Sequence, residues 1–88
     1  MRVTFKLFAT LGDYLPQQLG GHTRAGNQIA LDLAEEATVQ EVLERFPLPR
    51  ALVHLVLVNG VYIVPEARAS HRLREGDALA VWPPIAGG

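Results

Sequence analysis

Apolar and polar residues alternate along three stretches of the chain, at residues 2–7, 28–33 and 78–82. A period of two residues is the pattern of a β-strand that has one face on a core. The apolar residues that share the core-facing side are Val3, Phe5, Leu7, Ile29, Leu31, Leu33, Leu79 and Val81. Phe8 and Trp82 fall on the other side of the alternation, so we expect both aromatic rings on the sheet face away from the core.

A nearly continuous run of leucine and valine at residues 52–58 predicts a buried strand in the centre of the sheet. Asn59 and Gly60 follow this run. They are a preferred pair for a two-residue type I′ turn, in which both positions need positive φ. Residues 61–64 then predict the returning strand of a hairpin, which Pro65 ends.

One amphipathic helix is predicted between the strand at residues 28–33 and the strand at residues 52–58. Thr38 and Glu41 have the spacing of a capping box, which satisfies free backbone donors at a helix start. The apolar residues that follow on one helical stripe are Val39, Val42, Leu43 and Phe46. Pro47 and Pro49 end the helix. The fold class predicted is α+β, a mixed sheet of four to five strands packed on one main helix.

The segments between these elements carry weaker patterns. Residues 11–19 contain glycine and proline, so we expect at most a short helical turn, at residues 13–15. Residues 20–27 predict a loop. The glycines of this loop match neither the P-loop nor the dinucleotide-binding spacing, and no helix follows, which argues against a phosphate site. Residues 66–74 are polar, and a turn at residues 75–77 leads into the last strand.

Composition fits a single small domain across residues 1–88. Hydrophobic residues make up 49% and charged residues 19%, so disorder is not expected. The formal charge is -1 and no basic run is present, which argues against nucleic-acid binding. The chain has no cysteine, so it has no disulfide, thiol nucleophile or thiolate metal ligand. No apolar run approaches the roughly 18 residues of a membrane span, and we expect a cytoplasmic protein.

Side chains that are suited to catalysis are scarce. Ser70 directly precedes His71, and neighbours in sequence rarely face each other as nucleophile and base. His22, His54 and His71 follow no metal-ligand spacing. We therefore expect no self-contained active site, no metal site and no bound cofactor.

Residues 83–88 predict a flexible tail on this domain. Pro83 and Pro84 favour an extended stem, whereas Gly87 and Gly88 lack Cβ and accept any backbone conformation. The α-carboxylate of Gly88 is ionised at neutral pH and is unreactive until something activates it. Taken by themselves, two glycines are equally compatible with an ordinary frayed terminus.

Phe8 and Trp82 lie beside the base of this tail in the predicted sheet. If the sheet face that carries them is open, the two rings form an exposed apolar patch, which favours a docking surface for a partner protein. If a loop covers that face, the rings belong to the interior. Both interpretations stay open at the level of sequence.

Three groups of residues resemble motifs of the MoaD/ThiS family of ubiquitin-like sulfur carriers. They are Val58-Asn59-Gly60, Leu73-Arg74-Glu75-Gly76-Asp77 and Trp82-Pro83-Pro84-Ile85-Ala86-Gly87-Gly88. The last group is most similar to the tail of the small subunit of molybdopterin synthase. The resemblance spans nearly the whole chain and implies a β-grasp, ubiquitin-like fold.

The resemblance also implies a mechanism and partners. A MoeB/ThiF-like adenylyltransferase would use ATP to adenylate the Gly88 carboxylate, and a sulfur donor would convert it to a thiocarboxylate. A MoaE-like large subunit of molybdopterin synthase would then accept the sulfur. The residues expected to contact partners are Phe8, Trp82, Pro83, Pro84, Ile85, Ala86 and Gly87.

Three alternatives to the molybdopterin pathway stay open. The carrier can serve thiamine, cysteine or another sulfur metabolite. A ubiquitin-like modifier would instead join Gly88 to lysine amines of other proteins. A β-grasp binding module with an idle tail is the third alternative.

Overall fold

A computed structural model describes residues 1–84 of the chain. The predictions made for Ile85, Ala86, Gly87 and Gly88 lie outside the described residues. No helix in the described part is long and apolar enough to cross a membrane.

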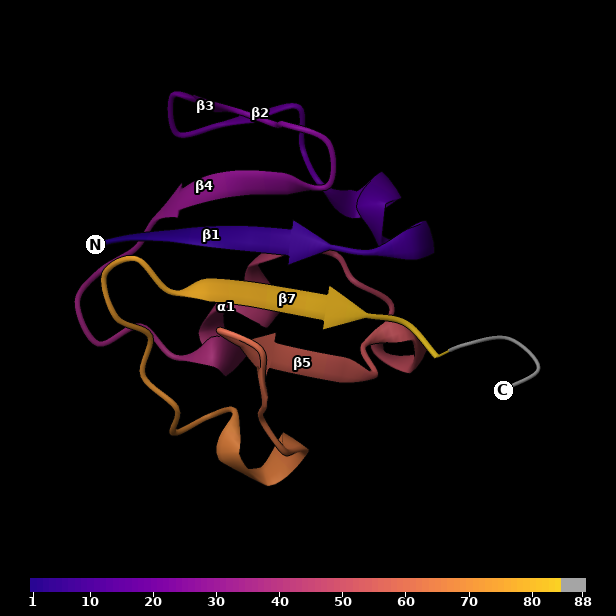
Figure 1. Ribbon diagram of the computed structural model, residues 1–88, viewed down its shortest axis with the longest axis vertical. Coiled ribbons are helices and arrows are strands. Elements are labelled where there is room, and N and C mark those ends of the chain that lie inside the picture. Colours follow the sequence, from indigo (N-terminus) through magenta and orange to yellow (C-terminus); the bar gives the residue numbers. More distant parts are fainter. Residues whose placement is uncertain (85–88) are drawn as a thin grey trace.

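A five-stranded mixed sheet forms the body of the molecule, in the order β4-β1-β7-β5-β6 (Figure 1). The bounds of its strands are β1 Arg2–Leu7, β4 Gln28–Asp32, β5 Leu55–Val58, β6 Val61–Tyr62 and β7 Ala78–Trp82. β1 and β7 run parallel, and every other pair in this sheet is antiparallel. The predicted alternating strands are thus confirmed as β1, β4 and β7, which lie side by side in the sheet.

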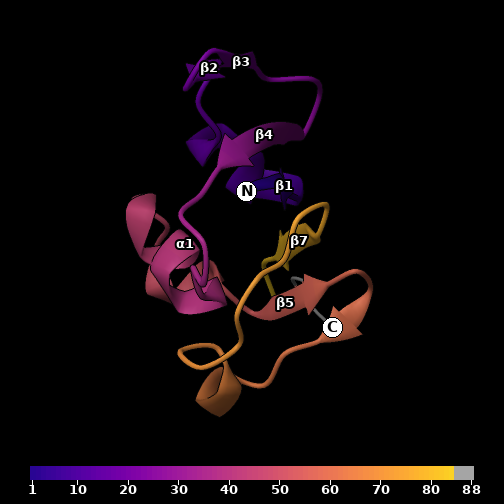
Figure 2. The same cartoon turned by 90° about the vertical axis from the view of Figure 1, so that its left-hand side faces the viewer.

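One helix, α1 (Val39–Arg45), packs on one face of the sheet (Figure 2). Thr38 caps it as predicted, because its Oγ1 accepts a hydrogen bond of 3.2 Å from the backbone N–H of Glu41. Phe46 ends the helix, and its ring stacks on that of Phe5 with centroids 4.8 Å apart. The predicted α+β class, with a mixed sheet on one main helix, is confirmed.

The core lies between α1 and this face of the sheet. Its most deeply buried side chains come from β1, β4, β5, β7 and α1, together with Leu11. They are Val3, Phe5, Leu7, Leu11, Ile29, Leu31, Val39, Val42, Val56, Leu79 and Val81. The sheet positions in this set are every second residue of their strands, so the opposite face consists of the intervening residues.

The prediction of a central, buried strand at residues 52–58 is wrong in three respects. Strand β5 begins only at Leu55, because residues Arg50–Leu52 form the short 3-10 helix η2. The middle strand of the sheet is β7, and β5 lies next to the edge. Leu55 is 39% exposed, since α1 covers only one face and the apolar residues of β5 alternate between the two.

The predicted hairpin after β5 is present, with positive φ at Asn59 (51°) and Gly60 (83°). Its returning strand is shorter than the predicted residues 61–64, because β6 contains only Val61 and Tyr62. The backbone N–H of Ile63 still donates to the Val56 carbonyl, at 2.9 Å. Beyond it the chain turns into the 3-10 helix η3 (Pro65–Ala67).

Two segments carry more regular structure than their sequence predicts. Residues Ala9–Tyr14 form the 3-10 helix η1, which is longer than the helical turn predicted at residues 13–15. The predicted loop at residues 20–27 contributes to a small antiparallel hairpin, β2 Gln18–Leu19 and β3 His22–Thr23. The Gly20-Gly21 pair at the turn has positive φ at both positions, a known signal for such a turn.

Candidate functional site

The Phe8 and Trp82 rings stack on each other at the end of the sheet where β7 ends. Their centroids are 3.8 Å apart and their planes differ by 6°. Strand register explains the contact: Leu7 is aligned with Val81 in the parallel pair, and the Phe8 N–H donates to the Val81 carbonyl at 3.0 Å. Trp82 is 38% exposed, so the residues that the structure describes leave this face partly open.

Further apolar side chains extend this stack across the same face of the sheet. Leu55 lies directly opposite Trp82 in the antiparallel β5–β7 pair, and Leu57 lies opposite Tyr62 in the β5–β6 pair. Residues opposite each other in a sheet project to the same side. We call Phe8, Leu55, Leu57, Tyr62 and Trp82 the open-face patch.

The alternation of apolar and polar residues predicts only Phe8 and Trp82 on this surface. Leu55 and Tyr62 are 39% and 46% exposed and are equally prominent. The missed signal was that the run at residues 55–58 lies in an antiparallel hairpin, which commonly has one solvated face.

The chain leaves the sheet directly beside the open-face patch. The last residue of β7 is Trp82, whose carbonyl accepts a hydrogen bond of 3.1 Å from the His54 N–H. Pro83 is buried and Pro84 is exposed. The structure therefore places Phe8, Trp82, Pro83 and Pro84 together, and the rest of the predicted site lies outside the described residues.

Two of the family-like motifs meet at the other end of the sheet. The Asn59 Nδ2 group donates to Asp77 Oδ1 at 2.9 Å, and the Ala78 N–H donates to Asn59 Oδ1 at 2.8 Å. Asp77 Oδ2 also accepts from the Arg74 N–H at 2.8 Å. These bonds join the β5–β6 turn to the turn before β7, so these motif residues stabilise the fold at the end away from Trp82.

The adjacent pair Ser70 and His71 does not form a nucleophile–base contact in the part of the chain that the structure describes. The Ser70 hydroxyl donates to the Ala67 carbonyl at 3.2 Å, so it is not paired with His71. Within residues 1–84 no three His, Cys, Asp or Glu side chains lie close enough to hold a metal ion.

One carboxylate has a perturbed pKa, and its surroundings explain the shift. His22 Nε2 lies 2.9 Å from Asp32 Oδ2, and Arg2 Nε donates to Asp32 Oδ1 at 3.1 Å. These contacts, His22 first and then Arg2, lower the pKa of Asp32. The group links the β2–β3 hairpin to β4 and to the start of β1, which is the end of that strand away from Phe8.

The profile described as Mut7-C ubiquitin matches residues 1–86. The chain belongs to the Mut7-C ubiquitin family. A search of curated proteins returned no match.

A solved structure with the same architecture is the crystal structure of SAMP1 from Haloferax volcanii. It superposes with a TM-score of 0.66 at 23% sequence identity, and the match covers 100% of both chains. The β-grasp, ubiquitin-like fold that the sequence motifs imply is therefore confirmed.

Proposed function

We propose that the chain is a sulfur carrier whose Gly88 carboxylate is converted to a thiocarboxylate and donates sulfur in molybdopterin biosynthesis. The observation that carries this proposal is the open-face patch at the point where the chain leaves a ubiquitin-like sheet. An exposed apolar patch of this kind is typical of a docking surface. A partner that holds this patch would also receive the residues that follow Pro84.

The reach of the tail fits this arrangement. Four residues follow Pro84 in the sequence, and at roughly 3.3 to 3.6 Å per residue they span at most about 13 to 14 Å when extended. The partner's reacting centre must therefore lie within that distance of the docked domain. The Phe8–Trp82 stack supports this requirement, because it gives the partner a structured surface beside the tail.

The chemistry needs a partner because a carboxylate is a poor electrophile. An adenylyltransferase of the MoeB/ThiF-like type would join the Gly88 carboxylate to the α-phosphorus of ATP, with loss of pyrophosphate. A sulfide equivalent would then attack the acyl carbon and displace AMP, which leaves the thiocarboxylate. ATP is bound by the partner in this scheme, and a MoaE-like subunit accepts the sulfur.

Mass spectrometry tests the proposal directly. Incubation with a cognate adenylyltransferase, ATP and sulfide is expected to exchange one oxygen for sulfur at Gly88. Leu55→Asp is expected to slow the exchange, because it places a charge in the patch. Val61→Asp is the matched control, since Val61 is 64% exposed and lies opposite Val58 on the other sheet face. Exchange at equal rates in both variants would reject the patch as the docking surface.

The identity of the recipient is tested separately. A molybdopterin synthase large subunit that co-purifies with the chain would support the molybdopterin pathway. Enzymes of thiamine or cysteine synthesis in its place would move the carrier to that pathway. Isopeptide-linked conjugates of Gly88 would instead indicate a protein modifier, and full function after deletion of Gly87 and Gly88 would indicate a binding module.

A further inference from the structure

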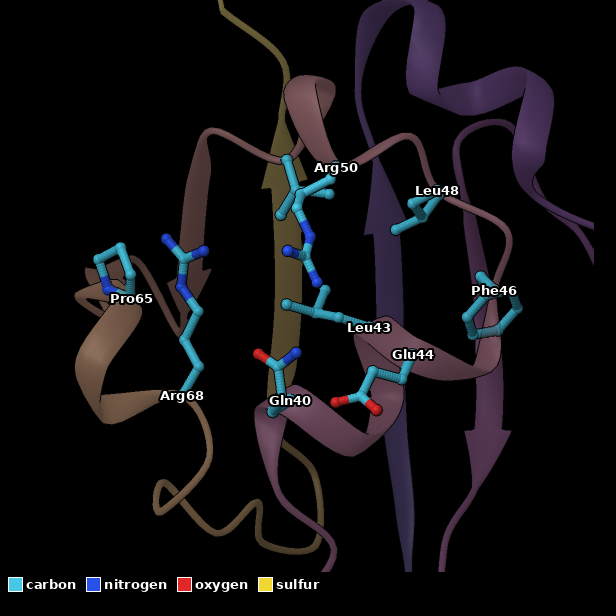
Figure 3. Close-up of a pocket in the computed structure, with 9 residues that line it drawn as sticks. Gln40, Leu43, Glu44, Phe46, Leu48, Arg50, Pro65 and Arg68 are labelled. Carbon is cyan, nitrogen blue, oxygen red and sulfur yellow. The ribbon is translucent and has the colours of Figure 1, made fainter.

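A hollow of about 510 Å³ lies on the helix side of the molecule, between α1, η2 and η3 (Figure 3). This is the side of the sheet away from the open-face patch. Its polar walls include Gln40, Glu44, Arg50 and Arg68, and Leu43 and Leu48 contribute apolar surface. We call it the arginine hollow.

Arg68 is the unusual member of this set, because it is only 7% exposed. Its Nε donates to the Ile63 carbonyl at 3.1 Å, and its Nη2 lies at the long distance of 3.5 Å from the His54 carbonyl. No carboxylate among residues 1–84 forms an ion pair with it. A buried charge is usually paired with an opposite one, so this guanidinium lacks the partner that its burial calls for.

The Nη1 group of Arg68, a residue that lines the hollow, is the part of its guanidinium without a partner in the described chain. It makes no hydrogen bond to any described residue. No fully buried side-chain nitrogen in the described part of the chain lacks a partner, so Nη1 must retain some contact with solvent. A guanidinium has five N–H donors, and those on Nη1 are free for a ligand that enters the hollow.

Two further groups offer donors to the same space. Figure 3 shows the Arg50 guanidinium and the Gln40 amide directed into the hollow that Arg68 also lines. Neither side chain forms a hydrogen bond or ion pair within residues 1–84. Glu44 is the single acidic group in the lining, so two cations face one anion and the hollow has a net positive charge.

We propose that the arginine hollow binds a carboxylate that is attached to a short apolar group. The planar guanidinium fork matches a carboxylate in shape and donates two parallel hydrogen bonds to it. Leu43 and Leu48 give the apolar part of the ligand a surface on which to pack. Inorganic phosphate has no apolar part to pack on these leucines, so we expect it to bind less tightly than such a carboxylate. The volume lies in the range of roughly 300 to 1,000 Å³ that is common for small-ligand pockets.

A titration of the ¹⁵N-labelled full chain with sodium hexanoate tests the site. Hexanoate is expected to shift the amide signals of α1, η2 and residues 63–68, and hexanamide, which has the same body without the charge, is expected to leave them unchanged. A second arm uses the capped peptide acetyl-Leu-Glu-Leu-amide. Tighter binding of this peptide than of hexanoate assigns the carboxylate to a partner's polypeptide segment, and the reverse order assigns it to a free organic acid. Either order of the two affinities supports the existence of the carboxylate site.

Substitutions at three exposed residues are expected to differ in their effect on the affinity for hexanoate. Arg50→Gln removes one guanidinium and is expected to weaken hexanoate binding about tenfold, as for one charged hydrogen bond. Glu44→Gln removes the repelling charge and is expected to tighten binding about two- to threefold. Arg45→Gln is the control, because Arg45 lies on α1 and does not line the hollow. It is expected to have no effect.

Three results would overturn the proposal: equal shifts from hexanoate and hexanamide, unchanged affinity in Arg50→Gln, or tighter binding of inorganic phosphate than of hexanoate. Arg68→Met is a weaker test, because loss of the bond to Ile63 can itself unfold the domain. If that variant folds, hexanoate is expected to raise the melting temperature of the wild type and not that of the variant.

Discussion

The stacked pair Phe8 and Trp82 provides the sharpest test of how the open-face patch is held in place. The structure brings the two rings together through the parallel register of β1 and β7, with centroids 3.8 Å apart and an interplanar angle of 6°. We predict that the two side chains stabilise each other beyond the apolar area that each one buries. The test is a double-mutant cycle in which each ring is replaced by leucine.

The expected magnitude follows from the exposure and geometry of the rings. Trp82 is 38% exposed, so roughly 90 to 150 Å² of its side chain is shielded, which corresponds to about 2 to 4 kcal/mol on truncation to alanine. That is a large part of the roughly 5 to 15 kcal/mol that stabilises a small domain. Leucine retains part of the buried area and keeps all four proteins folded. Aromatic pairs add about 0.5 to 1.5 kcal/mol, and the small offset between these rings favours the lower half of that range.

Urea denaturation followed by far-ultraviolet circular dichroism measures the cycle. Fluorescence is unsuitable, because Trp82 is the single tryptophan and is lost in two of the four proteins. The expected coupling free energy is about 0.5 to 1 kcal/mol. In thermal unfolding this coupling corresponds to about 3 to 5 °C for a domain of this size. A coupling within about 0.3 kcal/mol of zero would refute the reasoning, because the rings would then lie side by side without supporting each other.

Three further substitutions test how the fold is held together. Thr38→Ala is expected to cost about 1 kcal/mol in urea denaturation, because it removes the cap on the Glu41 N–H. Gly60→Ala is expected to cost about 1 kcal/mol in the same measurement. The cost is in the backbone alone, since Gly60 has φ of +83° and an added Cβ would meet nothing within 4 Å. The folded-state pKa of Asp32 is lowered, mainly by the hydrogen bond with His22. The ionised Asp32 carboxylate therefore stabilises the folded state fully above the usual pKa of 3.8, and this stabilisation is lost as the pH falls through the folded pKa. Asp32→Asn is therefore expected to flatten the acid limb of a stability-versus-pH curve below about pH 4, and an unchanged limb would contradict this assignment.

Hydrophobic periodicity predicts the strands and the helix whose buried side chains follow one regular spacing along the chain. The alternating residues of β1, β4 and β7 have one buried face each, and the helix stripe from Val39 to Phe46 lies on the core. The Asn59-Gly60 turn was predictable because few other residue pairs accept positive φ at both positions. In each case the local preference of the chain agrees with the tertiary structure.

The remainder depends on neighbours that a single sequence does not reveal. Residues 55–58 have the composition of a buried strand, but which of their side chains are covered depends on the position of α1. Arg68 belongs to a polar segment, and no sequence pattern predicts its burial, because its bond to the Ile63 carbonyl depends on the turn of the chain through η3. The open-face patch was thus predicted in part, and the arginine hollow was not predicted.

The short segment at residues 50–55 connects the arginine hollow to the open-face patch. A substitution in the patch can therefore also affect ligand binding in the hollow. Arg50 and Val53 line the hollow, and Leu55 in the patch follows two residues after Val53. A charge introduced at Leu55 can therefore displace η2 and weaken the hollow, as well as block docking. The Leu55→Asp variant separates these effects if its hexanoate affinity is measured together with its sulfur exchange. Slow exchange with normal hexanoate binding is expected from a docking surface, because Leu55 and the hollow lie on opposite faces of the sheet.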